Sequence, residues 1–218
     1  MKRVIAIDGP SGSGKSTISK RLSEKLGFQF LDTGALYRAI ALHLRNTNLT
    51  PESSDAEIGS ALEGVTVFFK NGRVLLNGRD VSDAIRTTEA GHYASVFSAR
   101  RAVRDFLLQV QRDAALYDDI VAEGRDMTTV VFPDAWRKFY LDASEESRAR
   151  RRYLQLKEKG TPVTLEEALK DVSERDARDS RRDIAPLKRA EDAIYIDTTG
   201  MSLDEVAAAI LKAAFSDD

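Results

Sequence analysis

The sequence predicts an α/β protein in which a parallel sheet of about five strands is flanked by helices. Three observations support this fold class. Short apolar runs alternate with helical patterns along most of the chain, which is the order found in doubly wound parallel sheets. A glycine-rich turn separates the first apolar run from the first helical pattern. A segment with two Asn-Gly pairs interrupts the alternation and predicts a small antiparallel β lobe inserted into the domain.

The glycine-rich turn follows the predicted strand at residues 4–7 and matches a phosphate-binding loop. Gly9, Gly14, Lys15 and Ser16 fill the fixed positions of G-x-x-x-x-G-K-[ST]. Glycines allow successive backbone N–H groups to face one anion at the positive end of a helix dipole. Lys15 is then expected to reach the β- and γ-phosphates of a nucleotide, and Ser16 Oγ is expected to bind Mg²⁺.

The elements after the loop keep the order helix, strand, helix. The apolar faces of the two helices are Ile18, Leu22 and Leu26 in the first and Leu36, Ile40 and Leu44 in the second. Residues 28–31 predict the strand between them. In parallel sheets ligands bind beyond the carboxyl ends of the strands, so we expect Thr33 and Arg38 on the same rim as the phosphate loop.

The inserted lobe begins where the composition turns polar, at residues 46–55. After this boundary, strand-forming residues surround Asn71-Gly72 and Asn77-Gly78, a pattern that predicts two tight turns and about three strands. A meander this small buries little on its own, so we expect it to pack on the main domain.

The second half of the chain returns to alternating elements. A helix is predicted at residues 99–112, with Val103, Phe106, Leu107 and Val110 as its apolar stripe. Three further strands are predicted at residues 120–122, 137–141 and 193–196. Ser202 and Glu205 form a capping box for a final helix that carries Leu203, Val206 and Ile210.

The composition is that of a globular protein, with 42% hydrophobic and 31% charged residues. A net charge of −2 disfavours a surface built to bind nucleic acid. No apolar run reaches the roughly 20 residues that span a bilayer. The chain has no cysteine, which excludes disulfides and thiolate metal sites. Its two histidines are too few for a histidine metal cluster. We therefore expect a cytoplasmic protein with no membrane or nucleic-acid partner, and a monomer.

One predicted helix, from residue 164 to 182, changes character along a single face. Thr164 and Glu167 form a capping box, and the inward face begins with Leu165, Ala168, Leu169 and Val172. The same face continues into Arg175, Asp179 and Arg182. Buried charges need partners, so this face is expected to line a cleft that binds an anion rather than to be a solvated surface.

A cluster of arginines at residues 148–152 follows the strand that ends at Asp142. Arginines carried by a short mobile segment are a common means of stabilising a transferring phosphoryl group. Gly160 and Pro162 supply a hinge. We interpret residues 145–162 as a short lid, with a solubilising helix face as the alternative.

These motifs together resemble bacterial-type cytidylate kinases of the nucleoside monophosphate kinase family. The resemblance covers nearly the whole chain and includes Gly9–Thr17, Leu31–Arg38, Gly124–Met127 with Val130–Ala135, and Arg175–Arg182 with Ala185–Leu187, in the family's order. It implies a three-layer P-loop kinase fold with a five-stranded parallel sheet. It also implies a core at residues 1–45, 92–144 and 163–218, with the acceptor-binding lobe at 46–91 and the lid at 145–162.

The resemblance implies transfer of the γ-phosphoryl group of ATP to CMP or dCMP, with Mg²⁺ bound at Ser16. ATP binding is implied for Gly9, Pro10, Ser11, Gly12, Ser13, Gly14, Lys15, Ser16 and Thr17. Catalytic roles fall on Lys15, Arg148, Arg152 and Arg178. The resemblance further implies that the acceptor's phosphate is bound by Thr33, Arg38, Arg125 and Arg182. It implies that cytosine is recognised by Ser95, Arg104 and Asp126, and that the sugar is bound by Arg175 and Asp179.

The sequence departs from the family pattern at Thr128, where glycine is usual after Gly-Arg-Asp-Met. If that glycine supplied a backbone angle that threonine resists, the positioning of Asp126 would change. Two other functions remain open: a P-loop kinase for another small acceptor, such as a different nucleoside monophosphate or shikimate, and a nucleotide-dependent switch or binding module.

Overall fold

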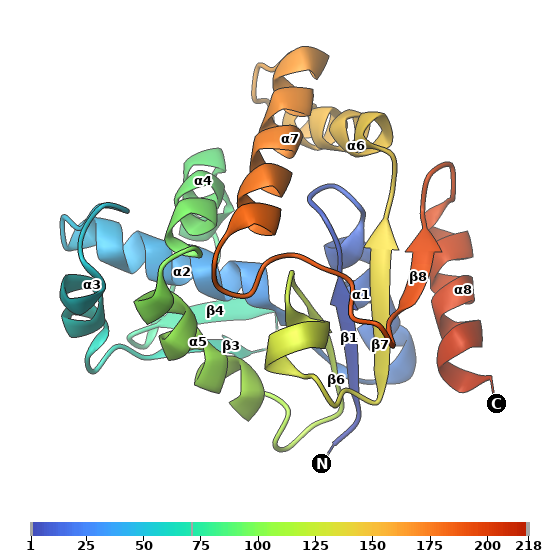
Figure 1. Ribbon diagram of the computed structural model, residues 1–218, viewed down its shortest axis with the longest axis horizontal. Coiled ribbons are helices and arrows are strands. Elements are labelled where there is room, and N and C mark those ends of the chain that lie inside the picture. The colour runs from blue at the N-terminus through green and yellow to red at the C-terminus, as the bar shows by residue number, and fades with distance from the viewer. Residues whose placement is uncertain (1, 71, 217–218) are drawn as a thin grey trace.

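The computed structural model describes residues 2–70 and 72–216 and shows helices on both faces of a central sheet (Figure 1). The strands of this sheet are β1 (Val4–Asp8), β2 (Gln29–Asp32), β6 (Ile120–Glu123), β7 (Arg137–Asp142) and β8 (Ile194–Asp197). They pair in parallel in the order β2-β6-β1-β7-β8. The predicted five-stranded parallel sheet is confirmed, and each strand begins and ends within about one residue of its expected position.

Alternate side chains of β1 enter two separate cores, because successive residues of a strand point to opposite faces of a sheet. Val4 and Ala6 pack against α2 (Thr33–Asn46) and α5 (Arg101–Asp113). Ile5 and Ile7 pack against α1 (Lys15–Leu26) and α8 (Leu203–Phe215). The expected apolar stripes of these helices are confirmed, except that Leu203 is exposed.

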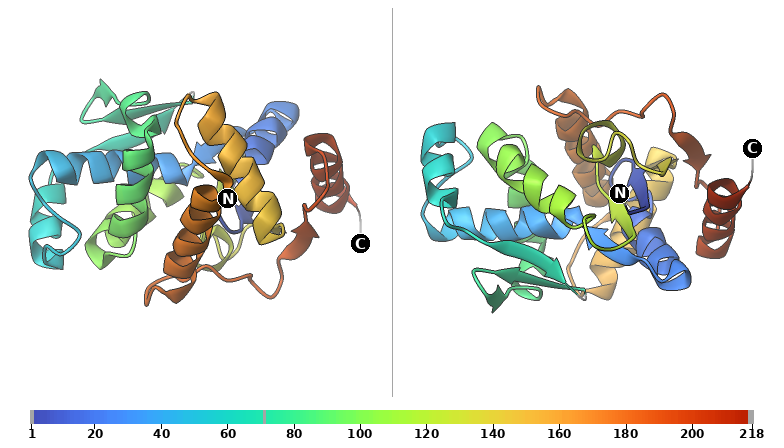
Figure 2. Two further views of the ribbon diagram at one scale, coloured as in Figure 1. Left: turned by 90° about the horizontal axis from the view of Figure 1, so that it is seen from above. Right: turned by 90° about the horizontal axis from the view of Figure 1, so that it is seen from below.

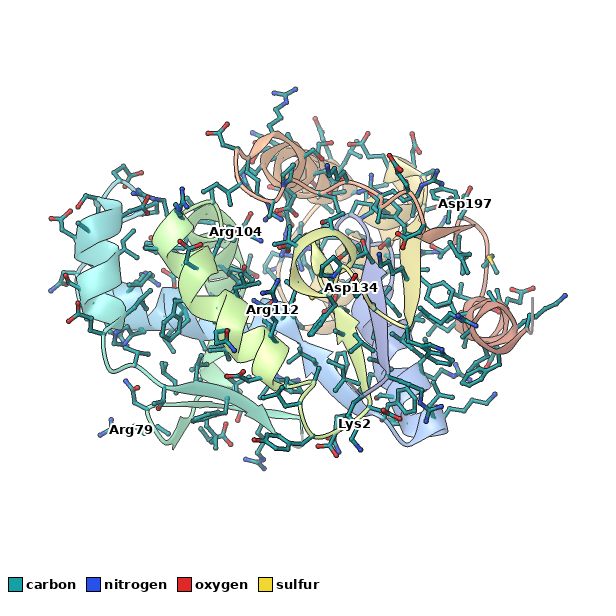
Figure 3. All side chains as sticks on the ribbon, turned by 60° about the horizontal axis from the view of Figure 1, so that its bottom comes forward. Lys2, Arg79, Arg104, Arg112, Asp134 and Asp197 are labelled. Atoms are coloured by element: carbon teal, nitrogen blue, oxygen red, sulfur yellow. The ribbon has the colours of Figure 1, made fainter. Side chains whose placement is uncertain are left out.

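The inserted lobe contains the expected antiparallel meander of β3 (Val67–Lys70), β4 (Arg73–Leu76) and β5 (Arg79–Asp80). Asn77 and Gly78 both have positive φ, as an Asn-Gly hairpin turn requires. Asn71, expected in the other turn, lies outside the described residues. Val67, Val74 and Leu76 share a core with α2, so the lobe packs on the main domain (Figure 2). Figure 3 shows Arg79 at the outer edge of the lobe, far from Asp197 at the end of β8.

Several short helices in the lobe, beside it and after β6 were not predicted. They are α3 (Asp55–Leu62), the 3₁₀ helix η1 (Ala84–Arg86), α4 (Thr88–Phe97) and the π-helical turn η2 (Met127–Val131). A capping box formed by Ser54 and Glu57 begins α3, within the stretch that the polar composition marked as a boundary. The expected end of the lobe at residue 91 falls inside α4. Such short helices carry too few apolar positions to produce a clear period in the sequence.

Two helices, α6 (Glu145–Glu158) and α7 (Leu165–Arg181), lie over the carboxyl ends of the strands (Figure 1). The capping box at Thr164 is confirmed, and Ala168 and Val172 are buried as expected. The prediction that Leu165 and Leu169 are buried is wrong, since they are 52% and 36% exposed. The reason is that α7 packs on α6 and α4 rather than on the sheet, so a narrower stripe is covered.

Among residues 2–70 and 72–216, no helix has both the length and the apolar character that crossing a bilayer requires.

Candidate active site

A cleft of about 1370 Å³ lies at the carboxyl ends of the strands, between the phosphate loop, α2, the lobe and the helix pair α6–α7. Most of the expected site residues line it: Ser11, Gly12, Ser13, Gly14, Lys15, Ser16, Thr17, Thr33, Arg38, Ser95, Arg104, Arg125, Asp126, Arg152, Arg175, Asp179 and Arg182. Four others lie outside its lining, namely Gly9, Pro10, Arg148 and Arg178. The topology therefore brings together groups that are up to about 170 residues apart in the sequence, because parallel strands end at one edge.

The phosphate loop has the backbone that its glycines predict. Gly9 has a φ of 150°, and a Cβ there would stand 1.9 Å from the carbonyl oxygen of Leu141. Gly14 has a φ of 92° and directly precedes α1. Only glycine meets both conditions at low cost. The loop is thus shaped so that the amino end of α1 faces the cleft.

Lys15 is buried in the loop, where Nζ donates to the carbonyl oxygen of Pro10 at 2.7 Å and to Ser13 Oγ at 3.3 Å. Burial, reinforced by the positive charge of Arg125, lowers the pKa of Lys15 to about 7. The charged form of such a buried lysine is stabilised when a negative charge is placed beside it. An anionic ligand in the loop would supply it.

Two side chains with oxygen atoms suited to a metal ion lie beside each other at the loop, Ser16 and Glu123. Ser16 Oγ donates to Glu123 Oε1 at 2.7 Å. Burial, and then the nearby charge of Asp32, raises the pKa of Glu123. The part of the chain that the structure describes contains no group of three or more His, Cys, Asp or Glu residues that could bind a metal alone. Mg²⁺ commonly uses one or two carboxylates together with substrate phosphates, so these oxygens fit it.

The opposite wall of the cleft carries buried ion pairs. Arg104 and Asp126 form one pair, and their side chains are only 6% and 4% exposed. Arg182 lies 3.7 Å from the other carboxylate oxygen of Asp126. Arg125 Nε donates to Asp179 Oδ2 at 2.8 Å. Burial would raise the pKa of Asp179, but the charges of the surrounding arginines hold it below its usual value. Both carboxylates are therefore paired with arginine side chains in the wall of the cleft.

Thr33 and Arg38 contact the residues that end β6 and β2. Thr33 Oγ1 donates to the carbonyl oxygen of Glu123 at 2.7 Å, and Arg38 Nη2 lies 3.2 Å from Asp32 Oδ2. Asp32 also caps α2 by accepting from the amide of Ala35. The first residues of α2, Thr33, Gly34 and Ala35, line the cleft.

Some guanidinium N–H groups of the same wall have no hydrogen-bond acceptor within residues 2–70 and 72–216. Among the described residues, Arg38 Nε, Arg175 Nε and Arg182 Nη2 are buried without a hydrogen-bond partner. Burial, followed by the charge of Arg125, lowers the pKa of Arg175 to about 10. Unpaired buried donors cost free energy, and a planar guanidinium suits phosphate oxygens. The arrangement can therefore bind a phosphate facing the loop.

The three arginines expected to be catalytic have different environments. Arg152 lines the cleft and donates to Asp171 Oδ2 at 2.9 Å. Arg148 is instead directed behind the phosphate loop, where it donates to the carbonyl oxygens of Ser11 and Ala143. Arg178 Nε donates to Ser95 Oγ at 3.1 Å on the opposite wall. Only Arg152 of these three faces the space between the two walls.

Comparison with known proteins identifies the family. The family model for cytidylate kinase matches residues 5–216. The chain belongs to the cytidylate kinase family. It is 53% identical to a cytidylate kinase of Thermodesulfovibrio yellowstonii over the full length of both chains, and 48% identical to one of Geobacter sulfurreducens, covering 93% of this chain and 88% of that one. An uncharacterized protein from Eubacterium ventriosum shares the fold, with a TM-score of 0.57, 14% identity and coverage of 99% and 100%.

The departure from the cytidylate kinase pattern at Thr128 causes no backbone strain. Thr128 is not among the described non-glycine residues with positive φ. It lies in the π-helical turn, where its amide and hydroxyl both donate to Asp8 Oδ2. Threonine therefore needs no left-handed backbone here, and its hydroxyl makes a hydrogen bond that glycine could not make.

Sequence reasoning missed three charged residues that line the cleft: Asp32, Glu123 and Arg151. The first two are the last residues of β2 and β6, so their position at the sheet edge was the available signal. Arg151 lines the cleft and donates to the carbonyl oxygen of Thr198 at 2.6 Å. It follows Arg148 by three residues, but helical spacing alone did not distinguish it from its neighbours.

Proposed function

We propose that this protein is an ATP-dependent kinase that converts CMP and dCMP to CDP and dCDP. The observation that carries the proposal is that Arg38, Arg175 and Arg182, each with a buried guanidinium nitrogen that has no hydrogen-bond partner among the described residues, line one cleft together with the phosphate loop. A loop for a donor phosphate and an arginine wall for an acceptor phosphate are the two requirements of phosphoryl transfer between nucleotides. Membership of the cytidylate kinase family supports the choice of acceptor.

The donor is ATP, bound by residues 9–17. The backbone amides of the loop face the phosphates, and Lys15 leaves its internal partners to bind the β- and γ-phosphate oxygens. Mg²⁺ is bound by Ser16 Oγ with the carboxylates of Glu123 and Asp32 close by, and it supplies neutralisation of charge on the phosphate oxygens.

The acceptor binds to the opposite wall. Its phosphate is bound by Thr33, Arg38, Arg125 and Arg182. Arg175 and Asp179 bind its sugar. Ser95, Arg104 and Asp126 recognise cytosine: the Asp126 side chain, paired with Arg104, accepts a hydrogen bond from the exocyclic amine, which uracil lacks. Uracil is rejected because its carbonyl oxygen would face the Asp126 carboxylate where the amine of cytosine donates, so that hydrogen bond is lost and two acceptors are placed together.

No general base is required, because a monophosphate oxygen is already a nucleophile near neutral pH. Lys15 and Arg152 stabilise the charge that develops on the transferring group. Arg148 and Arg178, also expected to be catalytic, lie behind the loop and beside Ser95, so their direct contact with that group requires movement of α6 or α7. Residues 145–162 act as the lid and residues 46–91 as the acceptor-binding lobe. The enzyme acts as a cytoplasmic monomer without a nucleic-acid partner.

An acceptor panel tests this function. Product formation is measured with ATP and Mg²⁺ against CMP, dCMP, UMP, AMP and shikimate, and kcat/KM is expected to be largest for CMP and dCMP. A preference for AMP or shikimate would replace the cytidine assignment by another small-acceptor kinase. Tight ATP binding without phosphorylation of any acceptor would indicate a nucleotide-dependent switch.

A further inference from the structure

One ion pair between α6 and α7 binds both backbone groups of Ser11 in the phosphate loop. The amide of Ser11 donates to Asp176 Oδ1 at 3.1 Å, and its carbonyl oxygen accepts from Arg148 Nη1 at 3.1 Å. Arg148 and Asp176 also pair directly with each other. The orientation of a residue in the donor loop is therefore set by side chains from two helices that cover the cleft.

The contact is tight enough to transmit movement. The side chains of Arg148 and Asp176 are only 10% and 20% exposed, and Arg148 Nε donates to the carbonyl oxygen of Ala143 at 2.9 Å. A Cβ on Gly12 would stand 2.9 Å from the carbonyl oxygen of Arg148, so the loop lies directly against the first turns of α6. Closely packed groups of this kind do not shift independently.

The other end of the contact lies on the helix that carries the acceptor residues. Asp176 directly follows Arg175 and lies within one helical turn of Asp179, and both of these neighbours line the acceptor side of the cleft. Arg175 has an unpaired buried nitrogen, and Asp179 is paired with Arg125. A ligand that satisfies these groups acts on the position of α7, and hence on the carboxylate that binds Ser11.

We propose that Asp176 is a positioning residue that couples acceptor binding to donor binding, by transmitting the position of α7 to Ser11 and Arg148. The proposal rests on the proposed function. Neither substrate touches Asp176; it acts through the loop peptide and the Arg148 guanidinium. Because coupling between two sites is reciprocal, the donor tightens acceptor binding by the same factor as the acceptor tightens donor binding.

Calorimetric titration tests the coupling. The dissociation constant of CMP is measured with and without saturating Mg²⁺ and a non-hydrolysable ATP analogue, in the unaltered protein, Asp176→Ala and Ser173→Ala. Ser173 is the matched control, since its hydroxyl donates to Glu145 across the same α6–α7 contact without reaching the loop. The analogue is expected to tighten CMP binding in the unaltered protein and in Ser173→Ala. In Asp176→Ala this coupling factor is expected to fall at least about fivefold.

A second variant, Asp176→Asn, tests the coupling without removing the whole side chain. Asp176→Asn keeps the size of the side chain and an acceptor for Ser11 but removes the charge that faces Arg148, and its coupling factor is also expected to fall. If Asp176→Ala does not fold, this variant decides alone. An unchanged factor in a folded Asp176 variant, or no coupling in the unaltered protein, overturns the proposal. Failure of the unaltered protein to bind CMP at all overturns the proposed function and this inference with it.

Discussion

The hydroxyl of Thr128 donates a hydrogen bond of 2.6 Å to the carboxylate of Asp8, and both side chains are buried. The amides of Met127 and Thr128 donate to the same carboxylate at 2.9 and 2.7 Å. Asp8 ends β1 and precedes the phosphate loop, whereas Thr128 follows Asp126 on the acceptor side. This contact connects the start of the phosphate loop to the turn that follows Asp126, the residue proposed to recognise cytosine.

Replacing Thr128 by valine removes the hydroxyl and keeps the shape of the side chain. We expect the free energy of unfolding to fall by about 1 kcal/mol, because Asp8 loses one of its three donors while buried. Thr128→Ser restores the donor and should recover most of the loss. Urea unfolding of the three proteins measures the effect, and equal stability of Thr128→Val and the unaltered protein would show that the hydroxyl contributes nothing.

Asp8 makes stability depend on pH. Burial, the largest cause, raises its pKa to about 6 from a usual value of 3.8. The folded state therefore binds this proton more tightly than the unfolded state, so the group's contribution is most favourable below pH 4 and is lost as pH rises through 6. A shift of this size corresponds to about 3 kcal/mol. We expect the stability of the unaltered protein relative to Asp8→Asn to decrease between pH 4 and 7.

Urea unfolding across this pH range measures that difference. Asp134→Asn, at an exposed position, is the control for removal of one carboxylate (Figure 3). A difference between the unaltered protein and Asp8→Asn that does not change with pH would contradict the burial effect.

The lowered pKa of Lys15 predicts that ATP binds more weakly at alkaline pH. Its pKa of about 7 in the free protein results first from burial and then from Arg125, and triphosphate binding favours the charged form. Above pH 7 the lysine must take up a proton on binding, so the dissociation constant of ATP should rise by up to about tenfold per pH unit. Calorimetry in buffers of different ionisation enthalpy detects the proton uptake. Lys15→Arg stays protonated and should show neither effect; uptake that persists in this variant would assign the proton to another group.

Asp126 should determine the preference for cytosine. Asp126→Asn presents an amide that can donate to the carbonyl oxygen of uracil, so the CMP to UMP ratio of kcat/KM should fall at least about tenfold. Asp126→Ala is a poorer probe, because it leaves the buried Arg104 charge unpaired at a cost of about 3–5 kcal/mol. Acceptor kinetics at saturating ATP measure the ratio. A full preference for CMP in folded Asp126→Asn would remove this residue from base recognition.

The arginines of α6 should separate into two classes. Arg152→Met removes a guanidinium that faces the cleft, and kcat should fall at least about a hundredfold with little change in stability. Arg148→Met should instead lower the melting temperature, because the carbonyl oxygens of Ser11 and Ala143 lose a buried donor. Arg150→Met, at an exposed position on the same helix, is the control. Comparable loss of kcat in Arg150→Met and Arg152→Met would indicate a general charge effect.

The sequence by itself determined the parts of this protein that depend on neighbouring residues. Residues 9–16 form the expected phosphate loop because glycine φ angles and the start of a helix are local properties. The strands, the capping boxes and the Asn77-Gly78 turn follow from short patterns in the same way. The charged face of α7 was also visible, because helical period alone aligns Arg175, Asp179 and Arg182.

Only the tertiary structure decided which of these groups meet. The contacts of Asp8 with Thr128 and of Asp176 with Ser11 span 120 and 165 residues, and no local pattern encodes such a pairing. The same reason applies to the arginines of α6: the sequence shows a cluster, but packing against the loop directs Arg148 behind it and leaves Arg152 in the cleft. Residue chemistry is local, whereas the partner of a buried charge is chosen by how the chain folds back on itself.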